Sequence, residues 1–211
     1  MTVGRKIAPH HENPLDNMLI DLADITNPVF RALHMTPNHI TVLSGVFGVA
    51  CVLAILLEHW VLAGWFYFVS YFFDVADGNY ARTYNMVTQF GDLLDHAKDA
   101  IVVLGVIWAV WHAESVSWEY KVTFFALQAL FYLCMSVHLG CQEHVYEKRR
   151  LREADQSDKM VVSESPTLSK FKCLCGHAPP DYLILWTRWV GCGTYTAITS
   201  AMLMVAGMNF V

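Results

Sequence analysis

Long runs of apolar residues constrain the fold of this chain more than any other feature. Residues 40–57 contain no charged side chain and are long enough to cross a bilayer as one helix. Apolar segments of similar length follow at residues 61–80, 92–111 and 120–139, and a last one covers residues 182–211. Charged residues make up only 16% of the chain, whereas soluble domains carry about a quarter. The sequence therefore predicts an all-α integral membrane protein, a bundle of five to six transmembrane helices.

Four aspartates in the second and third apolar segments belong to the most specific pattern in the sequence. An Asp-x-x-Asp-Gly-x-x-Ala-Arg motif is followed, after eight residues, by Gly-x-x-x-Asp-x-x-x-Asp. Its fixed positions are Asp74, Asp77, Gly78, Ala81, Arg82, Gly91, Asp95 and Asp99. Eight fixed positions arise by chance about once in 10^10 starting points. Ionisable residues within membrane segments are costly and normally functional, so we expect the functional site here.

The spacing of the acidic residues predicts a metal site between two helices. Asp74 and Asp77 would share one face of the second segment, and Asp92, Asp95 and Asp99 one face of the third. If these helices lie side by side, four or five carboxylates meet, and they need cations to remain ionised in a low-dielectric site. Hard oxygen ligands favour Mg²⁺ or Mn²⁺. We expect one or two such ions, with two as the preferred interpretation, because two ions can clamp a pyrophosphate.

The remaining motif positions have two interpretations. Gly78, Ala81 and Gly91 either let a nucleotide or phosphate approach the backbone or let membrane helices pack closely. The complete motif favours ligand contact. Arg82 is placed to pair with a phosphate.

The complete motif resembles the signature of the CDP-alcohol phosphotransferases, also called CDP-alcohol phosphatidyltransferases. These integral-membrane enzymes transfer a substituted phosphate from a CDP-linked donor to an alcohol and release CMP in phospholipid synthesis. The resemblance implies that Asp74, Asp77 and Asp95 are metal ligands. It implies that Asp99 binds metal or accepts the proton of the attacking hydroxyl. It also implies a donor-binding set, Gly78, Ala81, Arg82 and Gly91, and it leaves a homodimer open.

The chain is predicted to divide into two parts around this site. Residues 1–35 form a cytoplasmic N-terminus and an amphipathic interfacial helix, either continuous or broken at Pro28. Residues 36–211 form a single transmembrane catalytic domain with a polar cytoplasmic stretch at residues 142–181. Lys and Arg concentrate before the first span and in this stretch, so the active site should face the cytoplasm.

His96 bears on the substrate. It follows Asp95 directly, as in the choline/ethanolamine phosphotransferase branch, where the resemblance implies a general base and a diacylglycerol acceptor. Residues 12–16 and residues 37–41, which include Asn38, also resemble that branch. The alternative is a CDP-diacylglycerol-dependent enzyme such as a phosphatidylinositol or phosphatidylglycerophosphate synthase, whose length this chain matches. In that case His96 would only orient Asp92.

Weaker candidates and another class of function remain. Glu143 could reach the rim of the site, and Arg188 could bind an acceptor phosphate or extend to the membrane interface. A divalent-cation channel or carrier would also need buried acids, but it does not explain the spacing of the small residues and Arg82 around them. The net charge of −5 and the lack of a basic stripe argue against nucleic acid. The expected partners are therefore the CDP-linked donor, a lipid or polar alcohol acceptor, and membrane lipids.

Overall fold

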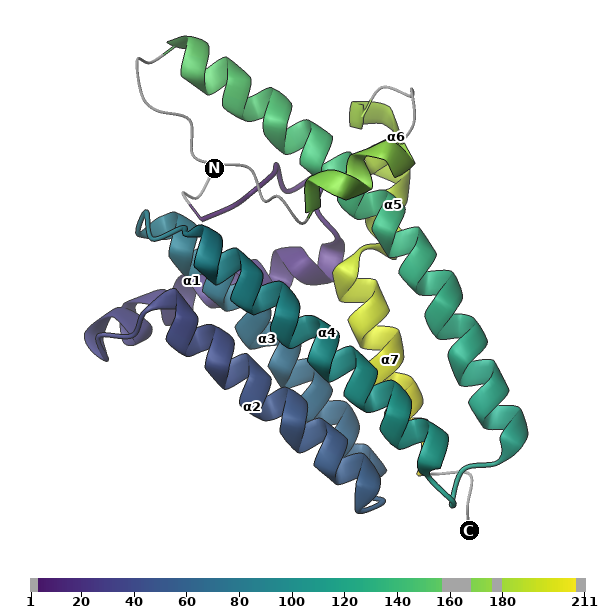
Figure 1. Cartoon of the computed structure of the whole chain (residues 1–211). Helices are drawn as coiled ribbons and strands as arrows, with labels where there is room; N and C mark the ends of the chain where they lie inside the picture. The colour runs from purple at the N-terminus through teal and green to yellow at the C-terminus, as the bar shows by residue number, and fades with distance from the viewer. Residues whose placement is uncertain (1–3, 157–167, 176–179, 208–211) are drawn as a thin grey trace.

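The computed structural model describes residues 4–156, 168–175 and 180–207, and these residues form helices without any strand (Figure 1). The elements follow one another as α1 (Pro14–Ala32), α2 (Pro37–Leu56), α3 (Trp60–Thr83), α4 (Gln89–His112), α5 (Trp118–Gln156), the 3₁₀ helix η1 (Leu168–Cys175), α6 (Pro180–Thr187), the 3₁₀ turn η2 (Arg188–Val190) and α7 (Cys192–Ala206). The predicted all-α fold is confirmed.

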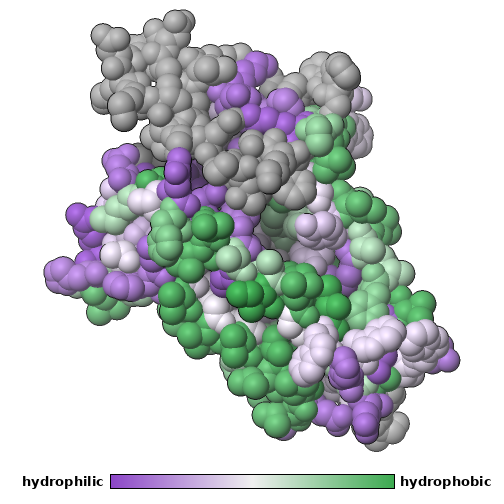
Figure 2. Space-filling model, viewed as in Figure 1, coloured by the Kyte–Doolittle hydropathy of each residue, from purple (hydrophilic) through white to green (hydrophobic). Residues whose placement is uncertain are grey.

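Three parts of the described chain are long and apolar enough to cross a membrane. They are Pro37–Leu56, Trp118–Arg149 and Tyr182–Ala206. The 24-residue helices α3 and α4 contain the acidic motif, and their passage through the membrane stays a prediction. Figure 2 shows an apolar surface over the middle of the molecule with polar surface toward both ends. This arrangement is typical of a membrane protein.

Helix α1 is amphipathic and continuous. The Asn13 side chain accepts a hydrogen bond from the backbone of Leu15, and Pro14 begins the helix, which continues through Pro28 to Ala32. Of the two alternatives, a continuous helix and a helix broken at Pro28, the structure shows the continuous one. One face of α1 is apolar and exposed, and it comprises Met18, Leu22, Ile25, Val29 and Leu33. Exposed apolar residues repeated at helical spacing suit a helix in the membrane interface, and this position of α1 stays a prediction.

Helix α2 sets the spacing of the bundle because it packs along both α3 and α4. On one side, Ser44 Oγ donates a hydrogen bond to the Ser70 carbonyl at 2.8 Å, and Ser70 Oγ donates one to the Ser44 carbonyl at 2.9 Å. On the other side, Gly48 has no room for a Cβ atom because Val102 lies against it. Close approach through small residues is the usual way in which membrane helices pack. Helix α3 also packs on α1 and α7, so it lies against three other helices.

Helix α5 differs from the prediction. The fourth apolar segment was expected to end near residue 139, but the helix continues to Gln156. Hydropathy marks where a helix leaves the lipid, whereas Glu, Lys, Arg and Gln in the following residues are good helix formers. The extension also has partners, since α5 packs on η1 and α6, and Lys172 Nζ lies 2.8 Å from Glu147 Oε2. The first part of the predicted polar stretch is therefore helical.

The last apolar segment, residues 182–211, is divided into shorter helices in its described part. Helix α6 ends at Thr187, the η2 turn covers Arg188–Val190, and α7 follows from Cys192. Helix α7 packs on α3, and in Figure 1 it lies between α4 and α5.

Candidate metal centre and its surroundings

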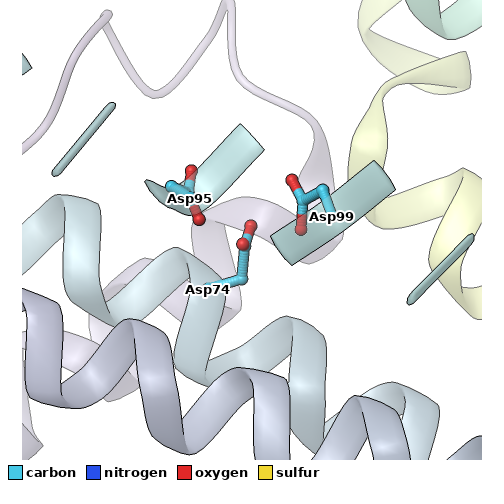
Figure 3. A group of neighbouring side chains, drawn as sticks. All are labelled: Asp74, Asp95 and Asp99. Carbon is cyan, nitrogen blue, oxygen red and sulfur yellow. The ribbon is translucent and has the colours of Figure 1, made fainter. Parts of the chain in front are cut away.

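Three motif carboxylates meet between α3 and α4. Asp74 projects from α3, and Asp95 and Asp99 project toward it from α4, one turn apart (Figure 3). One oxygen atom from each of the three lies within 4.8 Å of the others. Residues four apart on a helix point in directions about 40° apart, so Asp95 and Asp99 face the same neighbour. The structure thus brings together residues that are 21 to 25 positions apart in the sequence.

Lys98 occupies the middle of this cluster. Its Nζ atom bonds Asp74 Oδ1 and lies 2.7 Å from Asp99 Oδ1 and 3.1 Å from Asp95 Oδ1. It also donates a hydrogen bond to Ser44 Oγ at 3.2 Å. The side chain is only 9% exposed, so its ammonium is held by the carboxylates rather than by solvent. Lys98 was not among the predicted site residues, although a lysine inside an apolar segment and next to a motif aspartate indicates a functional position.

The cluster fits a divalent cation. Asp95 Oδ1 is buried and accepts no hydrogen bond in the described structure, although Lys98 is close to it. Carboxylate oxygens are the ligands that Mg²⁺ and Mn²⁺ prefer, and a positive charge already lies among them. Asp74, Asp95 and Asp99 are therefore suited to hold such an ion.

Asp77 lies apart from the three clustered carboxylates. Its Oδ2 atom accepts a hydrogen bond of 2.6 Å from Thr41 Oγ1 on α2, and the residue is buried. Because Asp74 and Asp77 are three positions apart, their directions on α3 differ by about 60°. Asp74 points to α4, whereas Asp77 points to α2. The expected meeting of four or five carboxylates is thus a group of three, with Asp77 one turn away.

His96 is bonded to Asp92 and not to the cluster. Its Nδ1 atom lies 2.7 Å from the backbone oxygen of Asp92 and 3.7 Å from the Asp92 carboxylate. A carbonyl oxygen can only accept, so Nδ1 carries the proton in the neutral ring and Nε2 is the basic nitrogen. This geometry matches the orienting role that the sequence analysis gave as an alternative, and it leaves Nε2 able to accept a proton.

The predicted donor-binding residues lie around the end of α3 and the start of α4. A Cβ atom at Gly91 would lie 3.2 Å from Asn38 Oδ1, so the structure brings Asn38 beside this motif glycine. A Cβ atom at Gly78 would lie 3.2 Å from Arg82 Nη1, so Gly78 gives the guanidinium room. Arg82 Nε donates to the Gly4 carbonyl at 2.7 Å. Ala81, which lies between Gly78 and Arg82 on α3, is half-buried.

The two weaker candidates contact the N-terminal segment, residues 4–13, rather than the carboxylate cluster. Glu143 is 1% exposed and forms an ion pair with Lys6. Arg188 Nη1 donates to the His10 carbonyl at 2.6 Å, and its guanidinium lies over the Trp189 ring. Both residues therefore help to hold the N-terminal segment in place. This role was not predicted from the sequence because residues 4–13 have no helical or strand periodicity.

A small hydroxyl-rich cavity of about 40 Å³ adjoins the cluster. Its polar lining comprises Ser44, Tyr67, Ser70, Tyr71, Thr196, Asp74, Lys98 and Asp99. These residues come from α2, α3, α4 and α7, so the cavity lies at the junction of four helices. Its volume is sufficient for one or a few water molecules.

Two further carboxyls are buried where the N-terminal segment meets α1. Glu12 accepts a hydrogen bond of 3.0 Å from Gln142, and Asp16 accepts one of 2.6 Å from Tyr71. Burial raises the pKa of Glu12 to about 7, and the charge of Asp16 contributes to the rise. Burial also raises the pKa of Asp16 to about 6, although the hydrogen bond from Tyr71 acts in the opposite direction.

The helical fold and the carboxylate cluster together define a membrane protein with a candidate divalent-metal site. The sequence model of the CDP-alcohol phosphatidyltransferase family matches residues 34–162, more than half of the chain. The chain therefore belongs to the CDP-alcohol phosphatidyltransferase family, and this family and the three long apolar segments indicate an integral membrane protein.

The sequence is also similar to that of a curated archaeal protein. The archaetidylinositol phosphate synthase of Pyrococcus horikoshii (strain ATCC 700860 / DSM 12428 / JCM 9974 / NBRC 100139 / OT-3) is 29% identical over 122 residues. The match covers 58% of this chain and 60% of that protein. No solved structure matches.

The raised pKa of Glu12 predicts that stability depends on pH. Between about pH 4.5 and 7 the folded protein keeps a proton on Glu12 that the unfolded chain has released, so stability falls as pH rises through this window. The substitution Glu12→Gln keeps an oxygen that can accept the hydrogen bond from Gln142, and it removes the fall in stability with rising pH because glutamine does not titrate. We expect it to raise the free energy of unfolding by about 1–3 kcal/mol at about pH 8, with little effect near pH 4.5.

The measurement is the unfolding of purified protein in detergent across this pH range. Glu114→Gln, at an exposed position, is the control and should follow the wild-type pH profile. Parallel profiles for wild type and Glu12→Gln would show that Glu12 does not hold its proton in the folded state.

Proposed function

We propose that this chain transfers a substituted phosphate group from a CDP-linked donor to an alcohol acceptor and releases CMP, as part of phospholipid synthesis. The observation that carries the proposal is the meeting of Asp74, Asp95 and Asp99 within the complete family motif. A cation channel or carrier would need acids along a path through the membrane. Asp74, Asp95 and Asp99 instead gather at one place between α3 and α4, with Asp77 one turn away on α3.

The proposed metal ligands are Asp74, Asp95 and Asp99, with Asp77 as a further ligand that Thr41 orients. We expect Mg²⁺ or Mn²⁺, and two ions rather than one. When bound, such ions would neutralise the donor's pyrophosphate and stabilise the leaving CMP. Holding the carboxylates in place before the donor arrives lowers the cost of organising the site during the reaction.

The proposed donor site comprises Gly78, Ala81, Arg82 and Gly91, with Asn38 beside Gly91. The two glycines allow close approach to the backbone at the end of α3 and the start of α4. Arg82 would supply a fixed positive charge for a phosphate or for the CMP group. Its bond to the Gly4 carbonyl uses Nε and thereby orients the guanidinium. The site would face the cytoplasm, as the distribution of Lys and Arg predicts.

The acceptor proton has two candidate bases. Asp99 is half exposed, more than Asp74 and Asp95, so a hydroxyl group from outside can reach it best. His96 Nε2 is the second candidate, because Nδ1 is bonded to Asp92. Aspartate and histidine both act as general bases in enzymes, so their roles are distinguished by mutation.

For the substrate, we propose a CDP-linked lipid donor and a polar alcohol acceptor. The relative's name, archaetidylinositol phosphate synthase, fits this alternative, and the contact between His96 and Asp92 agrees with an orienting role. Choline or ethanolamine transfer to diacylglycerol is the second candidate. Its support is the position of His96 directly after Asp95 and the resemblance of residues 12–16 and 37–41 to that branch.

Activity is expected to depend on a divalent metal and on Asp95. Asp95→Asn removes one charge from the proposed ligand set and should lower CMP release from CDP-linked donors by at least about 10²-fold. Excess chelator should have a similar effect, and added Mg²⁺ or Mn²⁺ should reverse it. The control is Asp21→Asn, because Asp21 is an exposed aspartate on α1, paired with Arg5. Full turnover in chelator, or a wild-type rate for Asp95→Asn, would contradict the proposal.

His96→Ala distinguishes the two substrate alternatives. If Asp99 is the base, the substitution should lower kcat only a few-fold, through lost orientation of Asp92, whereas Asp99→Asn should lower it by about 10²–10⁴-fold. If His96 is the base, His96→Ala should instead lower kcat by about 10²–10⁴-fold. The measurement is kcat with the donor identified in a screen of labelled CDP-choline, CDP-ethanolamine and CDP-diacylglycerol. A large loss in His96→Ala together with turnover of CDP-choline would favour the second candidate.

A further inference from the structure

We propose that the Lys98 ammonium competes with the metal ion for the carboxylates of Asp74, Asp95 and Asp99. In the described structure this ammonium occupies the cluster of Asp74, Asp95 and Asp99, and it must leave before a divalent ion can bind there. This inference rests on the metal site of the proposed function and concerns how that site is regulated. It assigns to Lys98 a role that the motif does not contain, since the motif leaves this position open.

The contacts of Lys98 show that it acts as a counter-ion within the cluster. Its ammonium lies 2.7 and 3.1 Å from oxygens of Asp99 and Asp95 on its own helix, and it bonds Asp74 on α3. Three carboxylates this close repel one another strongly unless a cation lies among them. A lysine ammonium has three N–H donors and a compact charge, which suits three carboxylates from different directions.

A lysine and a metal ion cannot share this position. The three carboxylate oxygens lie within 4.8 Å of one another, and Lys98 Nζ already lies close to each of them. Mg²⁺ binds oxygen ligands at about 2.0–2.1 Å, so it would occupy the space that the ammonium fills. The two states of the site, closed by Lys98 or open to a metal ion, therefore exclude each other.

The adjoining cavity offers Lys98 another position. Lys98 lines this cavity, and it already donates to Ser44 Oγ at 3.2 Å. Ser70 and Thr196 add further hydroxyl groups to the lining. The lysine side chain has a flexible stem of four carbons, so a modest rotation can transfer the ammonium from carboxylates to hydroxyls. The charge stays next to the site and keeps polar partners in both positions.

This competition has a measurable consequence for metal affinity. The apparent dissociation constant of the metal is the intrinsic value divided by the fraction of protein whose site is open. If Lys98 closes the site in more than about nine molecules in ten, removal of its charge should tighten metal binding by about tenfold or more. The metal-free protein should at the same time lose stability, because three carboxylates lose their counter-ion.

The test is Mn²⁺ binding to Lys98→Met without nucleotide, measured by electron paramagnetic resonance on purified protein in detergent. We expect a dissociation constant about tenfold or more below that of wild type, a lower melting temperature without metal, and a larger rise when Mn²⁺ is added. Lys121→Met is the matched control, because Lys121 Nζ donates to the Trp111 carbonyl away from the site. Lys98→Gln is the second variant, for use if Lys98→Met does not fold without metal.

The salt dependence of Mn²⁺ affinity shows whether Lys98 acts by occupying the metal site directly or through its charge at a distance. Charges in contact within a buried cluster are poorly screened, so the gain in affinity should persist at about 0.5 M salt. Unchanged or weaker Mn²⁺ binding by both Lys98 variants, or a gain that disappears at this salt concentration, would overturn the inference. Asp95→Asn provides the remaining comparison. If Asp95→Asn no longer binds Mn²⁺ while the Lys98 variants bind it as wild type does, the metal site stands and only the competition by Lys98 is wrong. If Asp95→Asn binds Mn²⁺ as wild type does, the proposed metal site is wrong as well.

Discussion

The repulsion among the carboxylates of Asp74, Asp95 and Asp99 is the constraint on which the rest of the structure depends. A cation has to lie between α3 and α4, and Lys98 is that cation in the described structure. Helix α2 keeps the two helices at the distance this requires, through the reciprocal serine bonds to α3 and the close packing of Gly48 on α4. The bundle is thus arranged around a charge that would be unstable alone in an apolar environment.

The N-terminal segment links this centre to the rest of the molecule. The Gly4 carbonyl orients Arg82, the ion pair of Lys6 with Glu143 fixes the segment on α5, and Glu12 is bonded to Gln142. The long extension of α5 is what makes these contacts available. Residues of the N-terminal segment, outside the apolar segments, therefore contribute to the site because they determine where the Arg82 guanidinium lies.

Much of this arrangement follows from local sequence. The charge-free run at residues 40–57 places α2 within a few residues, and the motif spacing predicts that Asp95 and Asp99 face α3. The separation of Asp77 from this group was not predictable, because it depends on the rotation of α3 relative to α2 and α4. Likewise the partners of Lys98 depend on the register between two helices. Helix α5 continues beyond the predicted apolar segment because the length of an apolar segment indicates the lipid boundary, whereas the end of a helix also depends on helix propensity.

A diffraction experiment on crystals grown with Mn²⁺, in which the anomalous signal places the metal, tests most directly whether the aspartates bind the ion. We expect an anomalous peak among the carboxylates of Asp74, Asp95 and Asp99, with the Lys98 ammonium moved away from them toward Ser44. A structure in which Mn²⁺ binds elsewhere while Lys98 still joins the three aspartates would contradict this expectation.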